Sequence, residues 1–175
     1  MPSNYSFWAL HVAIQDSMGW TDSHLHLFRF EKPKRKRQIE IGIPDPDGPW
    51  VGEKGCLASW EVPVLGYFGK PGTTAEYLYD FGDGWEHDAL LEEIAEVDGR
   101  ITYPVCLGGQ RRCPPEDCGG PHGYADFLEH ISDPKDKERA SLLRWAGGSF
   151  DPAKFDPAGV KFDSPARRLK WILES

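Results

Sequence analysis

The sequence predicts an α+β fold, in which an antiparallel sheet is covered by an N-terminal helix and by several short C-terminal helices. Three observations lead to this prediction. Apolar residues recur at helical spacing near the N-terminus, alternating segments follow in the middle of the chain, and helix-start signals containing proline recur in the last third. The 19 Gly and 15 Pro imply many turns, which argues against a mostly helical bundle.

The first predicted element is a helix over residues 6–18. Phe7, Leu10, Ile14 and Met18 recur at helical spacing and form an apolar stripe, which Trp8 and Val12 widen. Gly19 follows directly, and glycine is the common residue just past the end of a helix.

Four segments of alternating apolar and polar residues predict the strands of the sheet. They lie near residues 25–30, 38–43, 76–81 and 86–94. The last two are joined through Gly82-Asp83-Gly84, and Asp-Gly is a favoured pair for a tight hairpin turn because both positions accept a positive φ. His24 and His26 share one face of the first strand, so both could reach one metal ion.

Short helices are predicted after residue 124, and we expect them to lie against the sheet. Tyr124, Phe127, Leu128 and Ile131 form the apolar side of the first one. Capping residues stand directly before a proline at four places, which are Asp133, Asp151, Asp156 and Ser164. The first of these pairs predicts a helix that begins at residue 134.

Residues 103–124, which we name the joint segment, contain three of the four cysteines and are too rich in Pro and Gly for a regular helix or strand. We interpret them as the joint between a sheet-rich part, about 20–105, and a helical part, 124–175, of one domain over residues 1–175. A metal ion, a disulfide or packing must hold its shape. In a reducing compartment, clustered cysteines are more often metal ligands or free thiols than disulfides.

The joint segment offers a structural zinc site. Cys106, Cys113, Cys118 and His122 follow the spacing C-x6-C-x4-C-x3-H, and zinc prefers four thiolate or imidazole ligands. The fourth ligand could instead be a histidine from elsewhere, with His24, His26 and His87 as the candidates. The alternative is that the cysteines are reduced and packed within the loop.

A second candidate site combines the predicted hairpin with the first strand. Its members are His24, His26, Asp80, Asp83, Glu86 and His87, with Glu116 and Asp117 as further carboxylates. Crowded carboxylates raise one another's pKa and that of a nearby histidine, as in metal or acid–base sites. The simpler interpretation is that Asp80 and Asp83 bind amides of the turn while His87 packs or forms a hydrogen bond.

Composition and charge limit the partners. Hydrophobic residues make up 39% and charged residues 27%, as in soluble globular proteins. The N-terminus does not resemble a signal peptide, and no apolar run approaches the roughly 18 residues needed to cross a bilayer, so we expect a cytoplasmic protein without membrane contact. The net charge of −8 disfavours general nucleic-acid coating. A run of basic residues is best explained as an exposed loop with solvated charges, and the alternative is a local contact with a phosphate backbone. Its members are Lys32, Lys34, Arg35, Lys36 and Arg37.

Three motifs in the same order resemble the plasmid pRiA4b ORF-3-like family, whose members are also described as insertion-element passenger proteins of TnpR type. The motifs are Ile14-Gln-Asp-Ser-Met-Gly-Trp-Thr-Asp-Ser-His-Leu-His26, Tyr79-Asp-Phe-Gly-Asp-Gly-Trp-Glu-His87 and Cys113-Pro-Pro-Glu-Asp-Cys-Gly-Gly120 with Gly123-Tyr124. The resemblance spans residue 6 to about 162. It implies an α+β domain of a largely uncharacterised family, associated with plasmids or mobile elements.

Two departures from the family pattern matter. Family members usually carry a strand ahead of the first helix, so either the N-terminus is incomplete or the sheet has an open edge that could pair with a protein partner or a second copy. Members often have another residue at the position of His122, which weakens it as a ligand. We therefore expect an accessory or binding protein with a structural zinc ion, and the alternative is a metal-dependent hydrolase or nuclease.

Overall fold

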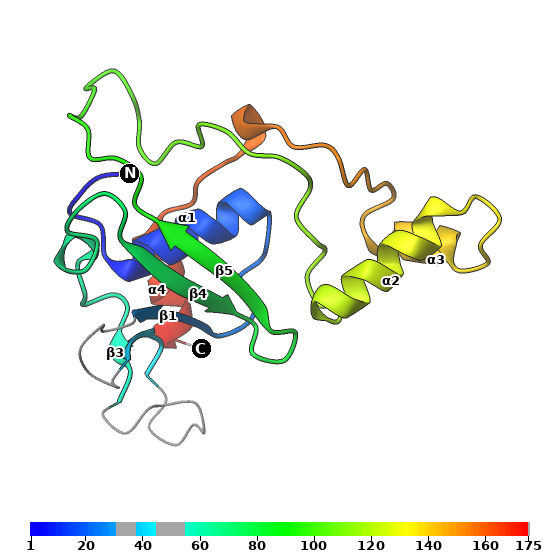
Figure 1. Ribbon diagram of the computed structural model, residues 1–175, viewed down its shortest axis with the longest axis horizontal. Coiled ribbons are helices and arrows are strands. Elements are labelled where there is room, and N and C mark those ends of the chain that lie inside the picture. Colours follow the sequence, from blue (N-terminus) through cyan, green and yellow to red (C-terminus); the bar gives the residue numbers. More distant parts are fainter. Residues whose placement is uncertain (31–37, 45–54, 175) are drawn as a thin grey trace.

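The computed structural model describes residues 1–30, 38–44 and 55–174, and it confirms the α+β class. A five-stranded sheet with the order β3-β2-β1-β4-β5 forms its centre (Figure 1). The strands are β1 (His26–Phe30), β2 (Ile39–Gly42), β3 (Leu57–Ala58), β4 (Thr74–Tyr79) and β5 (Trp85–Leu90). All neighbours are antiparallel except β2 and β3, which run parallel. The sheet is therefore mixed, whereas we predicted an antiparallel one. The prediction missed β3 because a strand of two residues is too short to show an alternation in the sequence.

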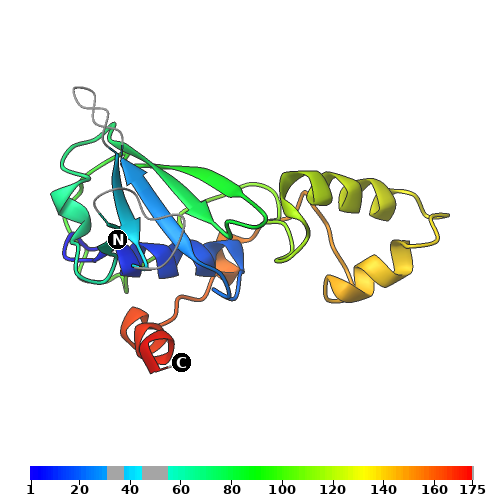
Figure 2. The ribbon, with the colours of Figure 1, turned by 90° about the horizontal axis from the view of Figure 1, so that it is seen from below.

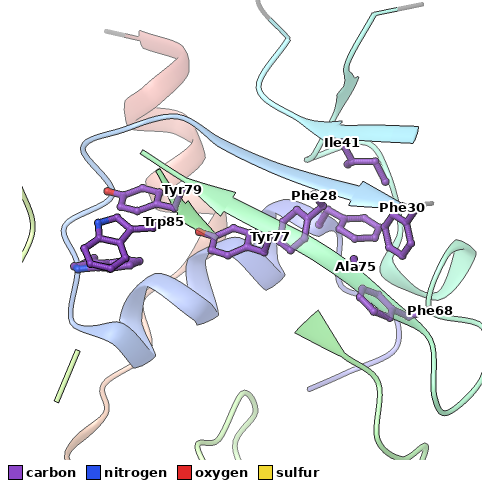
Figure 3. Packing of buried hydrophobic residues seen from close by; sticks show 10 residues of the cluster. Phe28, Phe30, Ile41, Phe68, Ala75, Tyr77, Tyr79 and Trp85 are labelled. Atoms are coloured by element: carbon purple, nitrogen blue, oxygen red, sulfur yellow. The ribbon is translucent and has the colours of Figure 1, made fainter. Parts of the chain in front are cut away.

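Helix α1 (Phe7–Met18) covers one face of the sheet. Ser6 caps its start by accepting a hydrogen bond from the backbone N–H of Ala9, and Gly19 ends it at φ 77°. Phe7 packs edge-on against Phe28 of β1, with 5.0 Å between the ring centroids. Figure 3 shows the row of buried side chains, which come from β1, β2, β4, β5 and the segment after η1. The labelled members are Phe28, Phe30, Ile41, Phe68, Ala75, Tyr77, Tyr79 and Trp85. Each large side chain of this row stabilises the fold by about 1.5–3 kcal/mol.

The later helices do not pack on the sheet as expected. Helices α2 (Gly120–Ser132) and α3 (Arg139–Trp145) pack on each other and project beside the sheet (Figures 1 and 2). Aromatic residues of the two helices and of the segment after α3 pack together. The ring centroid of Phe127 lies 5.9 Å from that of Trp145 and 5.0 Å from that of Phe150. Helix α4 (Pro165–Glu174) packs on α1, on the side facing away from the sheet (Figure 2). Two 3-10 turns, η1 (Val64–Gly66) and η2 (Pro157–Gly159), complete the described elements.

The helix predicted to begin at residue 134 begins five residues later. Asp133 ends α2 instead, and its side chain accepts a hydrogen bond from the N–H of Lys135 at 2.9 Å. Asp136 does the same for the N–H of Glu138 at 2.7 Å. These two local hydrogen bonds hold turns that compete with the helix, so α3 starts only at Arg139.

Two further predictions concern partners. No helix among the described residues is both long and apolar enough to cross a membrane. The basic residues between 32 and 37 lie outside the described residues, so their contact with nucleic acid stays a prediction.

Candidate functional site

Three of the predicted site residues, His24, Asp80 and Asp117, come together at one end of the sheet. One ligand atom from each lies within 4.8 Å of those of the other two. His24 precedes β1 and Asp80 follows β4, and these positions meet because β1 and β4 are antiparallel neighbours. Asp117 arrives from the joint segment. Over residues 1–30, 38–44 and 55–174, no other three His, Cys, Asp or Glu side chains meet in this way.

The His24 imidazole lies between the two carboxylates. Its Nε2 is 2.8 Å from Asp117 Oδ1 and 3.6 Å from Asp80 Oδ2. The side chain of Asp117 is 68% exposed, that of His24 30% and that of Asp80 10%. The group is therefore buried on the side of Asp80 and exposed to solvent on the side of Asp117. One imidazole and two carboxylates are ligands that Zn²⁺ and Mn²⁺ accept.

The loop between β4 and β5 fixes Asp80. Tyr79 pairs with Trp85, so the loop has five residues and is wider than the tight Asp-Gly turn that we predicted. Asp80 Oδ1 accepts hydrogen bonds from the backbone N–H of Gly82 and Asp83, at 3.0 and 3.2 Å. This turn leaves Oδ2 free of the loop and directed toward His24.

Both aspartates of the group have left-handed backbone conformations. Asp80 has φ 52° and Asp117 has φ 59°. Aspartate adopts this region more readily than most residues, but it still costs about 1 kcal/mol or more at each position. Strained residues gather at functional sites, which gives a second reason to single out this pair.

Glu116 braces the joint segment and does not join the group. Its carboxylate accepts hydrogen bonds from the backbone N–H of Thr21, at 2.9 Å, and from the hydroxyls of Thr21 and Tyr79. Burial alone would raise the pKa of Glu116, but these hydrogen bonds outweigh it and lower that pKa. The carboxylate therefore stays ionised and holds residues 21 and 79 together.

Other predicted members are also used for packing or bracing. Asp83 Oδ2 accepts a hydrogen bond from the backbone N–H of Gly119 at 3.1 Å. The His87 ring lies edge-on to Trp20, with 5.7 Å between the centroids, and burial lowers the pKa of His87. Glu86 lies on the exposed side of β5. The simpler interpretation of His87, as a packed histidine, fits these contacts.

The cysteines of the joint segment are free thiols in this structure. Cys113 Sγ lies 3.5 Å from the sulfur of Met18, and Cys106 Sγ lies 3.5 Å from the carbonyl oxygen of Gly108. Burial raises the pKa of Cys113 to about 12 and that of Cys118 to about 11. As metal ligands these cysteines would have to lose their protons, which an ion can drive.

Comparisons with known proteins show which family the chain belongs to. The sequence model of the plasmid pRiA4b ORF-3-like family matches residues 1–159. The chain belongs to this family. A relative, the uncharacterized protein y4hQ from Sinorhizobium fredii, is 38% identical over 157 residues, which cover 87% of this chain and 72% of the relative.

The fold has a counterpart among solved structures. The crystal structure of MM3350, a protein of unknown function from Methanosarcina mazei, is similar with a TM-score of 0.78 and 36% sequence identity. The similarity covers 93% of this chain and 86% of that chain. The α+β architecture of this pRiA4b ORF-3-like protein therefore occurs in an archaeal protein as well.

The part of the chain that matches the pRiA4b ORF-3-like family contains a buried polar group that we did not predict. His11 Nε2 lies 2.6 Å from Asp22 Oδ1, and His11 Nδ1 lies 2.8 Å from the hydroxyl of Tyr77. The Gln15 amide donates to that hydroxyl at 3.0 Å. A neutral imidazole with its proton on Nε2 donates to Asp22 and accepts from Tyr77. Burial, with a contribution from the Arg168 cation, holds the pKa of His11 well below its usual range.

His26 belongs to this buried group and not to the predicted metal site. Its ring stacks on His11, with 3.6 Å between the centroids and 12° between the planes. Only 1% of His26 is exposed, yet neither ring nitrogen has a hydrogen-bond partner. Burial also holds the pKa of His26 well below its usual range.

The sequence did contain a signal for this group. The residues of α1 that are most deeply buried include Trp8, His11, Val12 and Gln15, which recur at i, i+3, i+4 and i+7. The stripe that we predicted shares Phe7, Trp8 and Val12 with the buried set. Its other members, Leu10, Ile14 and Met18, are only partly buried. A histidine and a glutamine on the buried side of a helix indicate an internal hydrogen-bond network.

Proposed function

We propose that this pRiA4b ORF-3-like protein is a non-enzymatic accessory protein that binds one divalent metal ion between His24, Asp80 and Asp117. The observation that supports this most is the convergence of three ligand atoms, from three separate segments, within 4.8 Å. The donor set favours Zn²⁺ or Mn²⁺ over Ca²⁺, because Ca²⁺ takes oxygen ligands alone. The proposal moves the expected ion from the cysteines to the end of the sheet.

The ion would connect the sheet to the projecting helices. Asp117 lies three positions before Gly120, where α2 begins. Its exposed carboxylate is held in place mainly by His24, at 2.8 Å, and an ion would add a stronger link to the same side chain. Metal occupancy would thus control how firmly the start of the α2–α3 pair is attached to β1 and β4. This suits a protein whose helices contact a partner.

We also propose the association with plasmids or mobile elements. Its support is the name of the family, because that name describes a plasmid reading frame. The test is to express the protein beside a marked transposable element and to measure transposition frequency. An unchanged frequency would remove this part of the proposal.

A metal-dependent hydrolase is the second candidate. The observation in its favour is that three protein ligands leave a coordination position for water, as in catalytic zinc sites, and that Asp117 is 68% exposed. The test is hydrolysis of a chromogenic phosphodiester by the Zn²⁺- and Mn²⁺-loaded protein. We expect no turnover above that of the free ion. Turnover that disappears in Asp117→Asn would instead favour the hydrolase.

Metal binding is measured by isothermal titration calorimetry of the chelator-treated protein in reducing buffer. We expect one ion per chain for Zn²⁺ or Mn²⁺, and a loss of affinity of about tenfold or more in Asp117→Asn, because a carboxylate ligand becomes a neutral amide. Asp126→Asn is the matched control, since Asp126 is an exposed aspartate of α2 outside the group.

The cysteine site is separated from the proposed one by a second pair of variants. Cys113→Ser and His122→Ala should leave the affinity unchanged if the ion lies at His24. Loss of binding in Cys113→Ser, with unchanged binding in Asp117→Asn, would instead favour an ion bound by the cysteines. If the wild-type protein binds neither Zn²⁺ nor Mn²⁺, both metal proposals fail.

A further inference from the structure

Arg168 of α4 reaches into the buried group from outside. Its Nη2 lies 2.6 Å from Asp16 Oδ1, and its Nη1 lies 3.6 Å from Asp22 Oδ2. The side chains of Arg168, Asp16 and Asp22 are 16%, 7% and 3% exposed. A guanidinium this deep against two buried carboxylates is far more strongly held than a surface ion pair.

The backbone at the start of α4 is recognised as well. The indole N–H of Trp8 donates to the carbonyl oxygen of Pro165 at 2.7 Å. Asp16 Oδ2 accepts a hydrogen bond from the backbone N–H of Asp163 at 2.7 Å. We use the name notch for Trp8, Asp16 and Asp22 together. The notch binds two features of α4, which are the backbone turn at its start and, three residues after Pro165, the side chain of Arg168.

The fit of Arg168 in this notch is incomplete. Asp22 Oδ2 and Arg168 Nη1 are both buried, yet neither has a hydrogen-bond partner. At 3.6 Å the two atoms form an ion pair that is too long for a hydrogen bond, and a buried charge without a hydrogen bond costs free energy that a better placed ligand would recover. An occupant held in this way can be displaced more easily than one whose hydrogen bonds are all made.

The notch and its occupant also belong to different parts of the chain. Trp8, Asp16 and Asp22 lie within residues 1–159, which match the family, whereas α4 lies beyond them. Residues 160–164, which lead into α4, form neither helix nor strand. Such a connection can redirect α4 without breaking a regular element.

We propose that the notch of Trp8, Asp16 and Asp22 is a binding site for an arginine-bearing helix start, and that its ligand in trans is α4 of a second copy of the chain. The sequence of α4 meets the requirements of the notch, because it carries both the backbone turn and Arg168 at the right spacing. When α4 of one copy fills the notch of another, the two copies exchange helices and form a dimer. This inference is independent of the metal site.

The test measures binding of a fluorescein-labelled peptide of residues 160–174 to the full chain by fluorescence anisotropy. In the wild-type chain the internal α4 competes with the peptide. Arg168→Ala in the full chain weakens that competition, so we expect its affinity for the wild-type peptide to rise about tenfold or more. Arg167→Ala is the matched control, because Arg167 is 77% exposed and pairs with Asp163, and it should behave as the wild type.

Two further measurements complete the test. The Arg168→Ala chain with Asp16→Asn added, and the peptide carrying Arg168→Ala, should each lose the binding. If circular dichroism shows that Arg168→Ala is unfolded, Arg168→Lys replaces it, because lysine keeps the charge but cannot bind both carboxylates as a fork.

The dimer itself is measured by light scattering. The fraction of dimer should rise with the concentration of the wild-type chain and should be lower in Arg168→Ala. Peptide affinity that is unchanged in a folded variant, or a wild-type chain that stays monomeric, overturns the inference.

Discussion

Two histidine–aspartate groups occur at the start of β1, and they differ in burial. His24 is partly exposed and contacts the carboxylates of Asp80 and Asp117. His26, two residues later, is buried and stacks on His11, which is hydrogen-bonded to Asp22. Both groups contain histidine and aspartate, and the buried one adds Tyr77 and Gln15. Solvent access therefore separates the group for which we propose a ligand from the group that is packed into the fold.

The largest expected effect is the loss of His11. His11→Ala leaves Asp22 and the hydroxyl of Tyr77 buried without their partner and opens a cavity beside His26. We expect the free energy of unfolding to fall by about 3 kcal/mol, measured by urea denaturation. His24→Ala should lower it by less than about 1 kcal/mol, because His24 is partly solvated. Equal losses in the two variants would break the comparison.

The second effect is stabilisation by the metal ion. At about 100 times its dissociation constant, an ion bound only by the folded protein adds about 2.7 kcal/mol to the free energy of unfolding. In a chain of this size the midpoint of thermal unfolding should rise by about 2–4 °C per kcal/mol. At the same ion concentration, Asp117→Asn should lower the rise by about half or more, and Asp126→Asn should keep it. A rise of the same size in both variants would contradict the assignment of Asp117 as a ligand.

The third effect is the pH dependence of stability. The pKa values of His11 and His26 are held below 6.5 in the folded protein, so protons bind the unfolded chain first. Their contribution to stability is complete above about pH 6.5 and is lost as the pH falls below it. Asp22 acts in the opposite direction, because burial raises its pKa to about 6 and its folded form takes up the proton first. Below pH 6 the proton taken up by Asp22 in the folded protein offsets the loss of stability caused by one of the two histidines.

The net slope follows from these signs. Two histidines against one aspartate leave about one proton, so these three groups should lower stability by about 1.4 kcal/mol for each pH unit between roughly pH 6 and 5. Urea denaturation at several pH values measures it. His26→Leu removes one of the histidines and should flatten the curve. A curve that stays as steep in His26→Leu as in the wild type would contradict the assignment of the slope to the buried group.

The smallest expected effect is the stability change in His26→Leu at pH 8. Both ring nitrogens of His26 are buried without partners, so an apolar side chain of similar volume removes a penalty along with the ring stacking. We expect a change of less than about 1 kcal/mol in either direction. A loss as large as that of His11→Ala would mean that His26 makes a buried hydrogen bond, through an ordered water for instance.

The sequence predicted what local periodicity determines. α1 was predicted within one residue of its observed bounds, and β1, β2, β4 and β5 were each placed within a few residues. His24, Asp80 and Asp117 were predicted as members of one cluster, because the hairpin and the joint segment could bring carboxylates to the first strand. His26 was assigned to the wrong group, because alternation places it beside His24 and does not show where α1 covers the strand.

The rest depends on contacts across long stretches of chain. Nothing local pairs His11 with Tyr77, since each follows the ordinary pattern of its own helix or strand. The left-handed conformation of Asp117 depends on the docking of the joint segment. The projection of α2 and α3 beside the sheet depends on their finding a core in each other, which the apolar side of α2 alone does not reveal.

Arg168 lies 152 residues after Asp16, and this separation has a consequence during synthesis. Chains are made at about 5–20 residues per second and fold as they emerge. Asp16 therefore waits roughly ten to thirty seconds on the ribosome before its guanidinium partner exists. Throughout that interval the contacts of Trp8 and Asp16 with α4 are not yet made, so the surface of α1 that α4 later covers is open to a chaperone or to a neighbouring nascent chain on the same message.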